Sequence, residues 1–392
     1  MAAETARSFE ALERQAQALM AVFIKAGHEA VAPAMLQPAD IYLDAVGETL
    51  RARTYVFTDA NGDELCLRPD LTVPTCRLHL ERNGEAKETA RYCYNGPIFR
   101  FQPAGADAVH PREFRQAGIE TIGGGDPEIA EVETLSLVLA ALNQAGLEHA
   151  KLRLGDLGLF RALLEAIEMP KRWRDRLLHR FWRPAAFHAE LKRLATDPAL
   201  LVPKVPKTLL ESLDPGKPEA AEVAVMRHLE KEGIDLIGTR SAADIADSLI
   251  GVAADLKAKP LAPATVSLIE RYLRIAGPAS EAETQVRALV KEGRLSIGKA
   301  LERFDRRLAL IANAGIALEE AEFAAEFGRN LEYYTGFVFE LWTPGLGTQS
   351  PVAGGGRYDE LMRMVGSKQD IAAMGAAIHT ERLLAAIAGS RA

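Results

Sequence analysis

The chain has 392 residues, 48% hydrophobic and 26% charged, which is enough for two or three domains with sizeable cores. Its 54 acidic and 47 basic side chains give a formal net charge of −7, which argues against a general nucleic-acid-binding surface. Three cysteines, none in a Cys-x-x-Cys spacing, support neither a disulfide scaffold nor a structural zinc site. No apolar run has the roughly 18 residues of a membrane span, and the N-terminus lacks a secretion-signal pattern. We therefore expect a soluble, cytoplasmic protein.

The N-terminal half is expected to contain antiparallel strands with helices beside them. Ser8 can cap a first helix whose apolar residues recur every three or four positions as far as Phe23, and Gly27 supplies its stop. Asn61-Gly62 is typical of a tight hairpin turn, because both positions tolerate positive φ. The further elements predicted here are hairpin strands at 53–59 and 64–67, antiparallel strands at 92–100 and 114–122 joined by a loop at 102–111, a helix at 128–145 and a strand at 151–154.

From about residue 157 to residue 318 the pattern changes to successive helical segments separated by prolines. Strand character then returns at 337–342, and the elements expected after it are a glycine run at 354–356 and a closing helix at 380–387. We predict an α+β fold in three segments: a first core part at 1–156, an inserted helical domain at 157–318 and a second core part at 319–392. The two core parts would share one sheet.

Asp70 and Thr72 form the first group of candidate site residues. They follow a predicted strand that ends at Pro69, and a carboxylate and a hydroxyl placed there can hold an ammonium group. The alternative is that both residues cap the following helix, since Asp and Thr are common N-cap residues. Spacing alone does not decide between these interpretations.

The second group lies on the two central strands. Alternation along the strand at 114–122 places Gln116 and Glu120 on one face, toward the exposed end of Arg100. Buried polar groups of this kind need partners, because an unpaired buried carboxylate is costly. The residues therefore form either a ligand site or an internal ion pair between Arg100 and Glu120.

The third group lies near the C-terminus. Arg329 can bind a carboxylate through two N–H groups, and Tyr333 with Tyr334 offers an aromatic wall and a hydroxyl, which suits a small polar aromatic ligand. Three glycines precede Tyr358 and would let the backbone approach such a ligand closely. Strand packing for the tyrosines and an ordinary glycine loop are the alternatives.

In order along the chain, these segments resemble the catalytic core of a class II aminoacyl-tRNA synthetase, and specifically a histidyl-tRNA synthetase, over about residues 8–160 and 320–390. Pro33 resembles the proline of the family's dimer motif, and Arg100 and Arg382 resemble the arginines of its second and third motifs. The segments around Arg329 and Tyr358 resemble the two histidine-recognition signatures. This resemblance implies an antiparallel sheet flanked by helices, with an inserted helical domain.

Matched position by position, the resemblance implies a histidine-binding site. In the family, one arginine contacts the carboxylate of the amino acid and others contact ATP. The residues of this chain that the resemblance assigns to the site are Asp70, Thr72, Arg100, Gln116, Glu120, Arg329, Tyr333, Tyr334 and Tyr358.

The chain departs from the synthetase pattern on the nucleotide side. Gln102 stands where the family has an acid that reads adenine, and His379 stands where a glycine leaves room for the nucleotide. His379 could be an ordinary packed side chain, yet its bulk alone could obstruct that pocket. Only ten residues follow Arg382, so we expect no anticodon-binding domain.

A chain that keeps the histidine pocket but lacks tRNA recognition resembles the regulatory subunits of ATP phosphoribosyltransferase, a synthetase-like family of histidine biosynthesis. The resemblance implies no catalytic residue, metal or cofactor of its own. It implies a short catalytic phosphoribosyltransferase as partner, self-association as a dimer within a hetero-octamer, feedback inhibition by L-histidine, and neither tRNA nor membrane binding. The alternative is a minimal histidine-activating enzyme that uses ATP, because Arg100, Arg329 and Arg382 are all present. A paralogue that binds RNA fits the acidic composition less well.

Overall fold

The computed structural model describes residues 6–45, 50–84, 89–102, 105–106, 110–197, 205–214, 216–234, 241–328 and 331–390. The chain divides into two compact units. The core unit comprises Met1–Ala166 with Arg271–Ala392, and the helical unit comprises Ile167–Glu270. The predicted insertion at 157–318 contains the helical unit, but the segments on either side of Ile167–Glu270 belong to the core unit.

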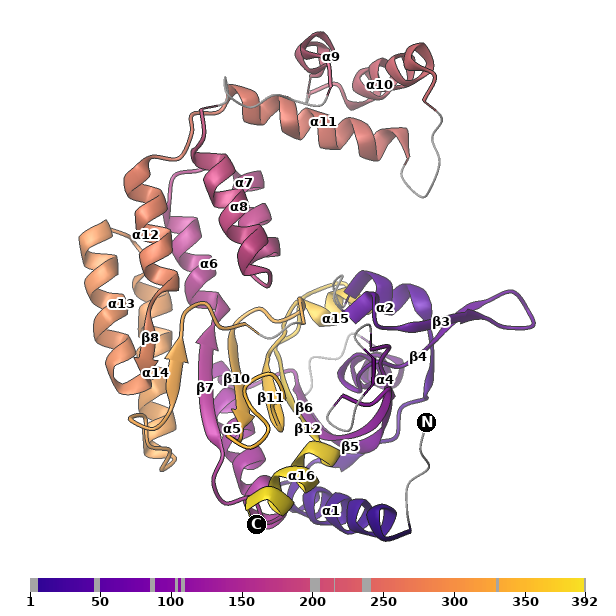
Figure 1. Ribbon diagram of the computed structural model, residues 1–392, viewed down its shortest axis with the longest axis vertical. Helices are drawn as coiled ribbons and strands as arrows, with labels where there is room; N and C mark the ends of the chain where they lie inside the picture. Colours follow the sequence, from indigo (N-terminus) through magenta and orange to yellow (C-terminus); the bar gives the residue numbers. More distant parts are fainter. Residues whose placement is uncertain are drawn as a thin grey trace. The chain divides into compact units, whose positions relative to one another are not determined.

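A nine-stranded sheet runs through the core unit in the order β1-β5-β6-β12-β11-β10-β7-β9-β8 (Figure 1). The strands are β1 (Glu29–Ala30), β5 (Ala90–Phe99), β6 (Glu113–Ile122), β7 (Lys151–Asp156), β8 (Ala276–Pro278), β9 (Glu322–Ala324), β10 (Phe337–Trp342), β11 (Ala353–Arg357) and β12 (Ala373–His379). Neighbouring strands are antiparallel except β1 with β5 and β7 with β9. The β6–β12 pairing joins the two ends of the chain in one sheet, as the sequence predicts.

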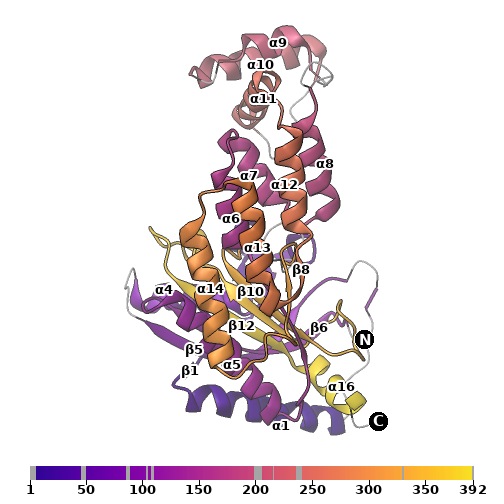
Figure 2. The same cartoon turned by 90° about the vertical axis from the view of Figure 1, so that its left-hand side faces the viewer.

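Helices cover the sheet. The core unit contains α1 (Ala6–Lys25), α5 (Pro127–Gln144), α6 (Leu157–Ala166), α13 (Ala279–Gly293), α14 (Gly298–Asn313), α15 (Leu361–Met364) and α16 (Thr380–Ser390). α1 lies along β5 and β6 beside α5, which also packs against α14 (Figure 2). The predicted N-cap at Ser8 is wrong, because α1 already begins at Ala6; Ala6 and Arg7 are strong helix formers and extend it.

The predicted hairpin forms part of a separate three-stranded sheet with the order β2-β4-β3. It contains β2 (Leu36–Pro38), β3 (Tyr55–Thr58) and β4 (Glu64–Leu67), and α2 (Ala39–Ala45) and α4 (Thr72–Asn83) adjoin it in sequence. The turn between β3 and β4 is a longer loop organised by Asp59, whose carboxylate accepts hydrogen bonds from the backbone of Asn61 at 2.8 Å and Asp63 at 3.0 Å. Gly62 takes a φ of 91°, the conformation for which the sequence selects glycine.

The glycine run at 354–356, which has low strand propensity, is the central strand β11. Close packing explains this choice. A Cβ on Gly355 would collide with the backbone oxygen of Gly375 on β12, and a Cβ on Gly356 would lie 2.8 Å from the ring of Tyr334. Glycine is selected here by neighbours far away in sequence, so local pattern alone does not identify the strand.

The helical unit has a core of its own. Its helices are α7 (Lys171–Arg180), α8 (Pro184–Ala195), α9 (Lys207–Ser212), α10 (Pro218–Glu232), α11 (Ala242–Lys257) and the first part of α12 (Pro263–Leu273). Leu210, Val225 and Ala253 are buried where α9, α10 and α11 meet. Asp255 of α11, almost fully buried, accepts hydrogen bonds from Arg172 at 2.6 Å and from the Trp173 indole at 2.5 Å, which ties α11 to α7. Among the helices described in both units, none is long and apolar enough to cross a membrane.

Candidate ligand-binding site

A cavity of about 510 Å³ opens in the core unit beside β6, β11 and β12. The predicted site residues that line it are Asp70, Thr72, Arg100, Gln116, Tyr333 and Tyr334. The structure therefore brings together side chains from α4 and the loop before it, from the residue after β5, from β6 and from the segment before β10. The pattern of the sheet places them, because Gln116 and the lining residues of β12 point from neighbouring strands toward the same side.

Asp70 contributes to the start of α4, as one of the two interpretations of the sequence predicts. Its Oδ1 accepts a hydrogen bond from the backbone N–H of Val73 at 3.2 Å in the first turn of α4, and the Tyr42 hydroxyl lies 3.5 Å from the same oxygen. Its Oδ2 is buried and has no hydrogen-bond partner in the described structure. Burial raises the pKa of Asp70 to about 6, an effect that the nearby Arg100 guanidinium partly offsets.

Two further polar atoms at the cavity are buried without a hydrogen-bond partner among the described residues. They are Gln116 Oε1 and His379 Nε2. Most buried polar atoms in folded proteins are hydrogen-bonded, so such atoms around a cavity indicate a site that a ligand or ordered water completes.

Glu120, a predicted site residue, does not line the cavity. Its carboxylate is completely buried and accepts a hydrogen bond from the Tyr94 hydroxyl at 2.8 Å on one oxygen and from the Tyr358 hydroxyl on the other. Burial raises the pKa of Glu120 to about 7, although hydrogen bonds from Tyr358, Thr72 and Tyr94 oppose that shift. Sequence analysis missed Tyr94; the alternation of β5 beside β6 is the signal that could have found it.

The three predicted tyrosines form one cluster, but the prediction that Tyr358 lines the cavity is wrong. The ring centroid of Tyr333 lies 4.9 Å from that of Tyr334 and 5.8 Å from that of Tyr358. Tyr333 and Tyr334 face the cavity, whereas Tyr358 lies behind it against Glu120. Arg329, the predicted carboxylate ligand, lies outside the described residues.

The same cavity contains the departures from the synthetase pattern. The His379 ring stacks on Phe114 at a centroid separation of 4.1 Å with only 5° between the planes. Burial lowers the pKa of His379 to about 4, so this ring is neutral near pH 7. Gln102 accepts a hydrogen bond from Arg53 and donates one to the Pro111 carbonyl at 2.9 Å. Its amide is thus used within the protein.

Arginines also line the cavity. Arg100 donates from Nε to the Pro69 carbonyl at 2.8 Å, and its guanidinium carbon lies 5.4 Å from the Phe114 ring centroid. Arg382 donates to the Pro351 carbonyl at 3.1 Å and is held in the cavity rather than exposed as an isolated surface charge.

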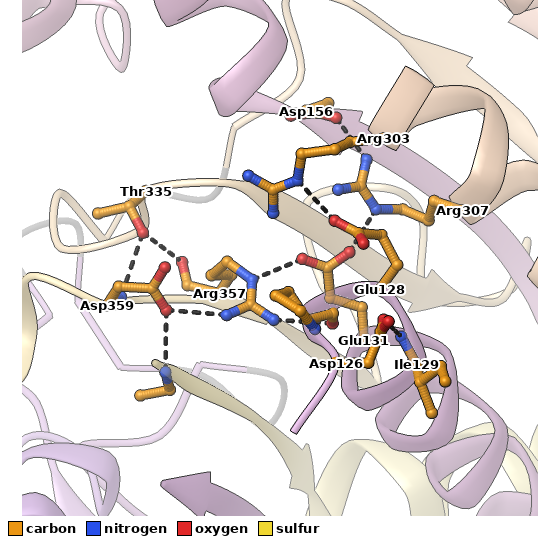
Figure 3. A network of polar contacts seen from close by, with 12 residues as sticks. Asp126, Glu128, Ile129, Glu131, Asp156, Arg303, Arg307, Thr335, Arg357 and Asp359 are labelled. Atoms are coloured by element: carbon orange, nitrogen blue, oxygen red, sulfur yellow. Dashed lines mark hydrogen bonds and ion pairs between the residues drawn. The ribbon is translucent and has the colours of Figure 1, made fainter. Parts of the chain in front are cut away.

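A charge network behind the sheet fixes the segment that carries Tyr358 (Figure 3). We define it as Glu131, Asp156, Arg307, Arg357 and Asp359. Glu131 of α5 is completely buried and accepts hydrogen bonds from Arg307 of α14 and, at 2.6 Å, from Arg357 of β11. Arg357 also binds Asp359 at 2.9 Å, and the same Asp359 oxygen accepts from the backbone of Ala373 at 2.9 Å. The network therefore locks both sides of Tyr358 to the sheet.

Most of the residues that line the cavity differ in type from the usual ligands of a metal ion. In the described part of the chain no group of three or more His, Cys, Asp or Glu side chains could hold a metal ion. The cavity instead offers acceptors, aromatic rings and arginines, which together can bind a small zwitterion with a polar ring.

Comparisons with known proteins place this geometry in a family. The Histidyl-tRNA synthetase family profile matches residues 4–235 and 220–383. A solved structure from Bacillus halodurans, described as an ATP phosphoribosyltransferase regulatory subunit/histidyl-tRNA synthetase, has a TM-score of 0.69 at 20% identity over 99% of this chain and 82% of its own. A histidine–tRNA ligase subunit from Alicyclobacillus acidocaldarius has a TM-score of 0.61 at 21% identity, covering 100% of this chain and 97% of its own. These likenesses confirm the predicted class II synthetase-like fold.

Sequence relatives are more specific. An ATP phosphoribosyltransferase regulatory subunit from Brucella anthropi is 37% identical over 361 residues, covering 89% of this chain and 90% of the relative. One from Brucella canis is 36% identical over 369 residues, covering 91% and 92%. With this identity along nearly the whole length, the chain belongs to the family of ATP phosphoribosyltransferase regulatory subunits.

Proposed function

We propose that the cavity binds free L-histidine and that this binding regulates a separate catalytic ATP phosphoribosyltransferase. The observation that carries the proposal is a pair of buried acceptor atoms, Asp70 Oδ2 and Gln116 Oε1, that lie beside Tyr333 and Tyr334 and have no hydrogen-bond partner among the described residues. An ammonium group offers donors to a carboxylate, and a ring N–H offers one to an amide oxygen. A histidine molecule supplies both kinds of donor and an aromatic ring for the wall.

His379 and Gln102, which also line the cavity, favour a regulatory role rather than the ATP-dependent activation of histidine. His379 already stacks on one face of Phe114, so an adenine ring would have to displace it to use that face. The Gln102 amide is engaged by Arg53 and Pro111, which leaves it poorly placed to read a base. We propose that the chain performs no chemistry of its own and takes no cofactor.

The partner is proposed from the name of the relatives. A regulatory subunit implies a catalytic one, and we propose that this is the short form of ATP phosphoribosyltransferase, a glycosyltransferase of the first step of L-histidine biosynthesis. The chain would form a dimer within a cytoplasmic hetero-octamer. For feedback inhibition, histidine must bind one state of this assembly more tightly than another, because a ligand with equal affinity for both shifts nothing.

Two measurements test the proposal. Isothermal titration calorimetry of the purified chain should show saturable histidine binding, and histidine at 100 times its Kd should raise the free energy of unfolding by about 2.7 kcal/mol. The chain mixed with its catalytic subunit should form a stable complex whose phosphoribosyltransferase activity falls when histidine is added. No histidine binding would contradict the assigned ligand, and histidine-dependent exchange of pyrophosphate into ATP would favour the synthetase-like alternative.

A further inference from the structure

The carboxylate of Glu120 is held by two tyrosines from different strands of the sheet. Tyr94 of β5 donates to Oε1 at 2.8 Å, and Tyr358, which follows β11, donates to Oε2. All three side chains are buried. Each carboxylate oxygen therefore has a tyrosine hydroxyl donor, and these two bonds orient the carboxylate.

Two glycines provide the space for this arrangement. Tyr94 pairs across the strands with Gly118, and a Cβ on Gly118 would lie 2.6 Å from the Tyr94 hydroxyl oxygen. The missing side chain lets the Tyr94 ring cross its partner and reach Glu120, two residues further along β6. On the other side, a Cβ on Gly375 would collide with Glu120 Oε2. The backbone is thus shaped around the Tyr94–Glu120 contact.

Glu120 is connected to the cavity although it does not line it. Gly375, whose backbone lies against the Glu120 carboxylate, is a lining residue of the cavity. Thr72, another lining residue, contributes a hydrogen bond to Glu120. The Glu120 carboxyl group therefore contacts two residues that line the cavity in which the ligand would bind.

We propose that Tyr94 is a positioning residue that determines how tightly the cavity binds histidine, because its hydrogen bond orients the Glu120 carboxylate beside the cavity. This inference rests on the proposed binding of histidine. Tyr94 does not line the cavity, so it acts through Glu120 rather than by contact with the ligand.

The physical reason is competition between burial and hydrogen bonding. Burial favours the neutral acid at Glu120, and each hydroxyl donor favours the anion. Removing the Tyr94 hydroxyl removes one of the hydrogen bonds that stabilise the Glu120 anion against the effect of burial. The pKa of Glu120 should then rise further, and less of the anion should be present near neutral pH. The titratable groups that face Glu120 from the elements around it are Tyr94, Tyr358, Tyr333, Asp70 and Cys76.

The test is the histidine Kd of Tyr94→Phe relative to wild type between pH 5.5 and 8.5. We expect about 10-fold weaker binding at pH 7, the usual effect of one hydrogen bond to a charged group, with recovery toward wild type as the pH rises. The protonation of free histidine is the same in both measurements, so it does not affect the ratio of the two Kd values. Tyr92→Phe is the matched control, because Tyr92 is buried on the same strand but its hydroxyl lies 3.2 Å from His79 Nδ1.

The outcomes separate the two proposals. If wild type does not bind histidine, the proposed function fails. If wild type binds and the Tyr94→Phe ratio is constant with pH, or matches that of Tyr92→Phe, the positioning role is wrong. If Tyr94→Phe does not fold, the second experiment replaces every tyrosine of the wild-type sequence by 3-fluorotyrosine, which is a stronger hydrogen-bond donor. We then expect the midpoint of the curve of histidine affinity against pH to move to lower pH. An unmoved midpoint would overturn the inference.

Discussion

Two clusters of buried polar groups in the core unit differ in one respect. In the charge network, Glu131 binds two arginines, and each of these binds a further acid: Arg307 binds Asp156 and Arg357 binds Asp359. At the cavity, by contrast, Asp70, Gln116 and His379 each keep a buried atom without a partner in the described structure. Both clusters lie against the same sheet, yet only one is complete.

The difference separates groups that hold the fold from groups available to a ligand. A completed network of charges specifies one arrangement of helix and strand, and removal of one member leaves an uncompensated charge. An incomplete cluster costs free energy until something binds, which is why functional sites are often less stable than they could be. Substitutions in the two clusters should therefore have opposite signatures.

The largest expected effect is the loss of stability in Glu131→Gln. This substitution leaves Arg307 and Arg357 buried with one acid each, and we expect the free energy of unfolding to fall by about 3–5 kcal/mol. The control is Glu133→Gln on the same helix, which breaks an exposed pair with Arg91 and should cost less than about 1 kcal/mol. Urea unfolding measures both. Equal costs would show that the network is no more stabilising than a surface pair.

The second prediction concerns ligand affinity. Asp70→Asn keeps an oxygen that can cap α4 but removes the charge facing the cavity, so histidine binding should weaken by about 10- to 100-fold. Titration calorimetry measures this change. Asp63→Asn, at an exposed position of the β3–β4 loop, should bind histidine like wild type. If Asp70→Asn retains wild-type affinity, the ligand's ammonium does not lie at Asp70.

The same pair of proteins gives a pH prediction. Because burial raises the pKa of Asp70 to about 6, the folded chain binds this proton more tightly than the unfolded chain does. Wild type therefore loses stability relative to Asp70→Asn as pH rises from about 4 to about 6, by about 3 kcal/mol at most. Urea unfolding of both proteins across this range tests the sign. A stability difference that does not change with pH would contradict the raised pKa.

The smallest effect is expected on the nucleotide side. His379→Ala exposes the Phe114 face, so the affinity for ATP should rise by about 2- to 10-fold, the usual range for one aromatic stacking contact. Histidine binding should change little. His149→Ala, at an exposed position, serves as control. Competition with a fluorescent adenine nucleotide measures the change, and no gain in affinity would mean that His379 is not what blocks the base.

Much of the fold could be predicted from local patterns. Strand-forming runs and helical segments that end at a stop residue predicted β5, β6, β10, α5 and α16, because such signals are local in the sequence. β11 and β12 were harder to predict, since glycine and alanine are weak strand formers and occur there because the strands pack closely. The start of α1 was misplaced because a good cap residue is only one of several signals that fix a helix end.

At the candidate site, too, some features could be predicted from the sequence and others depend on residues far away in it. The family resemblance implied that Asp70, Thr72, Gln116 and the tyrosine pair belong to one site, and the structure brings these residues together at one cavity. Their individual states were not predictable. Whether Glu120 meets an arginine or a tyrosine depends on strand pairing, and whether His379 is exposed or stacked depends on Phe114, which lies on a strand more than 250 residues away in sequence.

The sequence by itself determined the type of most elements and the family resemblance, because both are written in short spacings and motifs. The tertiary structure alone decided which polar atoms are satisfied. Glu131 meets Arg357 across 226 positions of sequence and Tyr358 meets Glu120 across 238, and no local rule specifies such contacts. Charge state, orientation and access to the cavity follow from these long-range neighbours, since burial and hydrogen bonding set the free energy of each polar group.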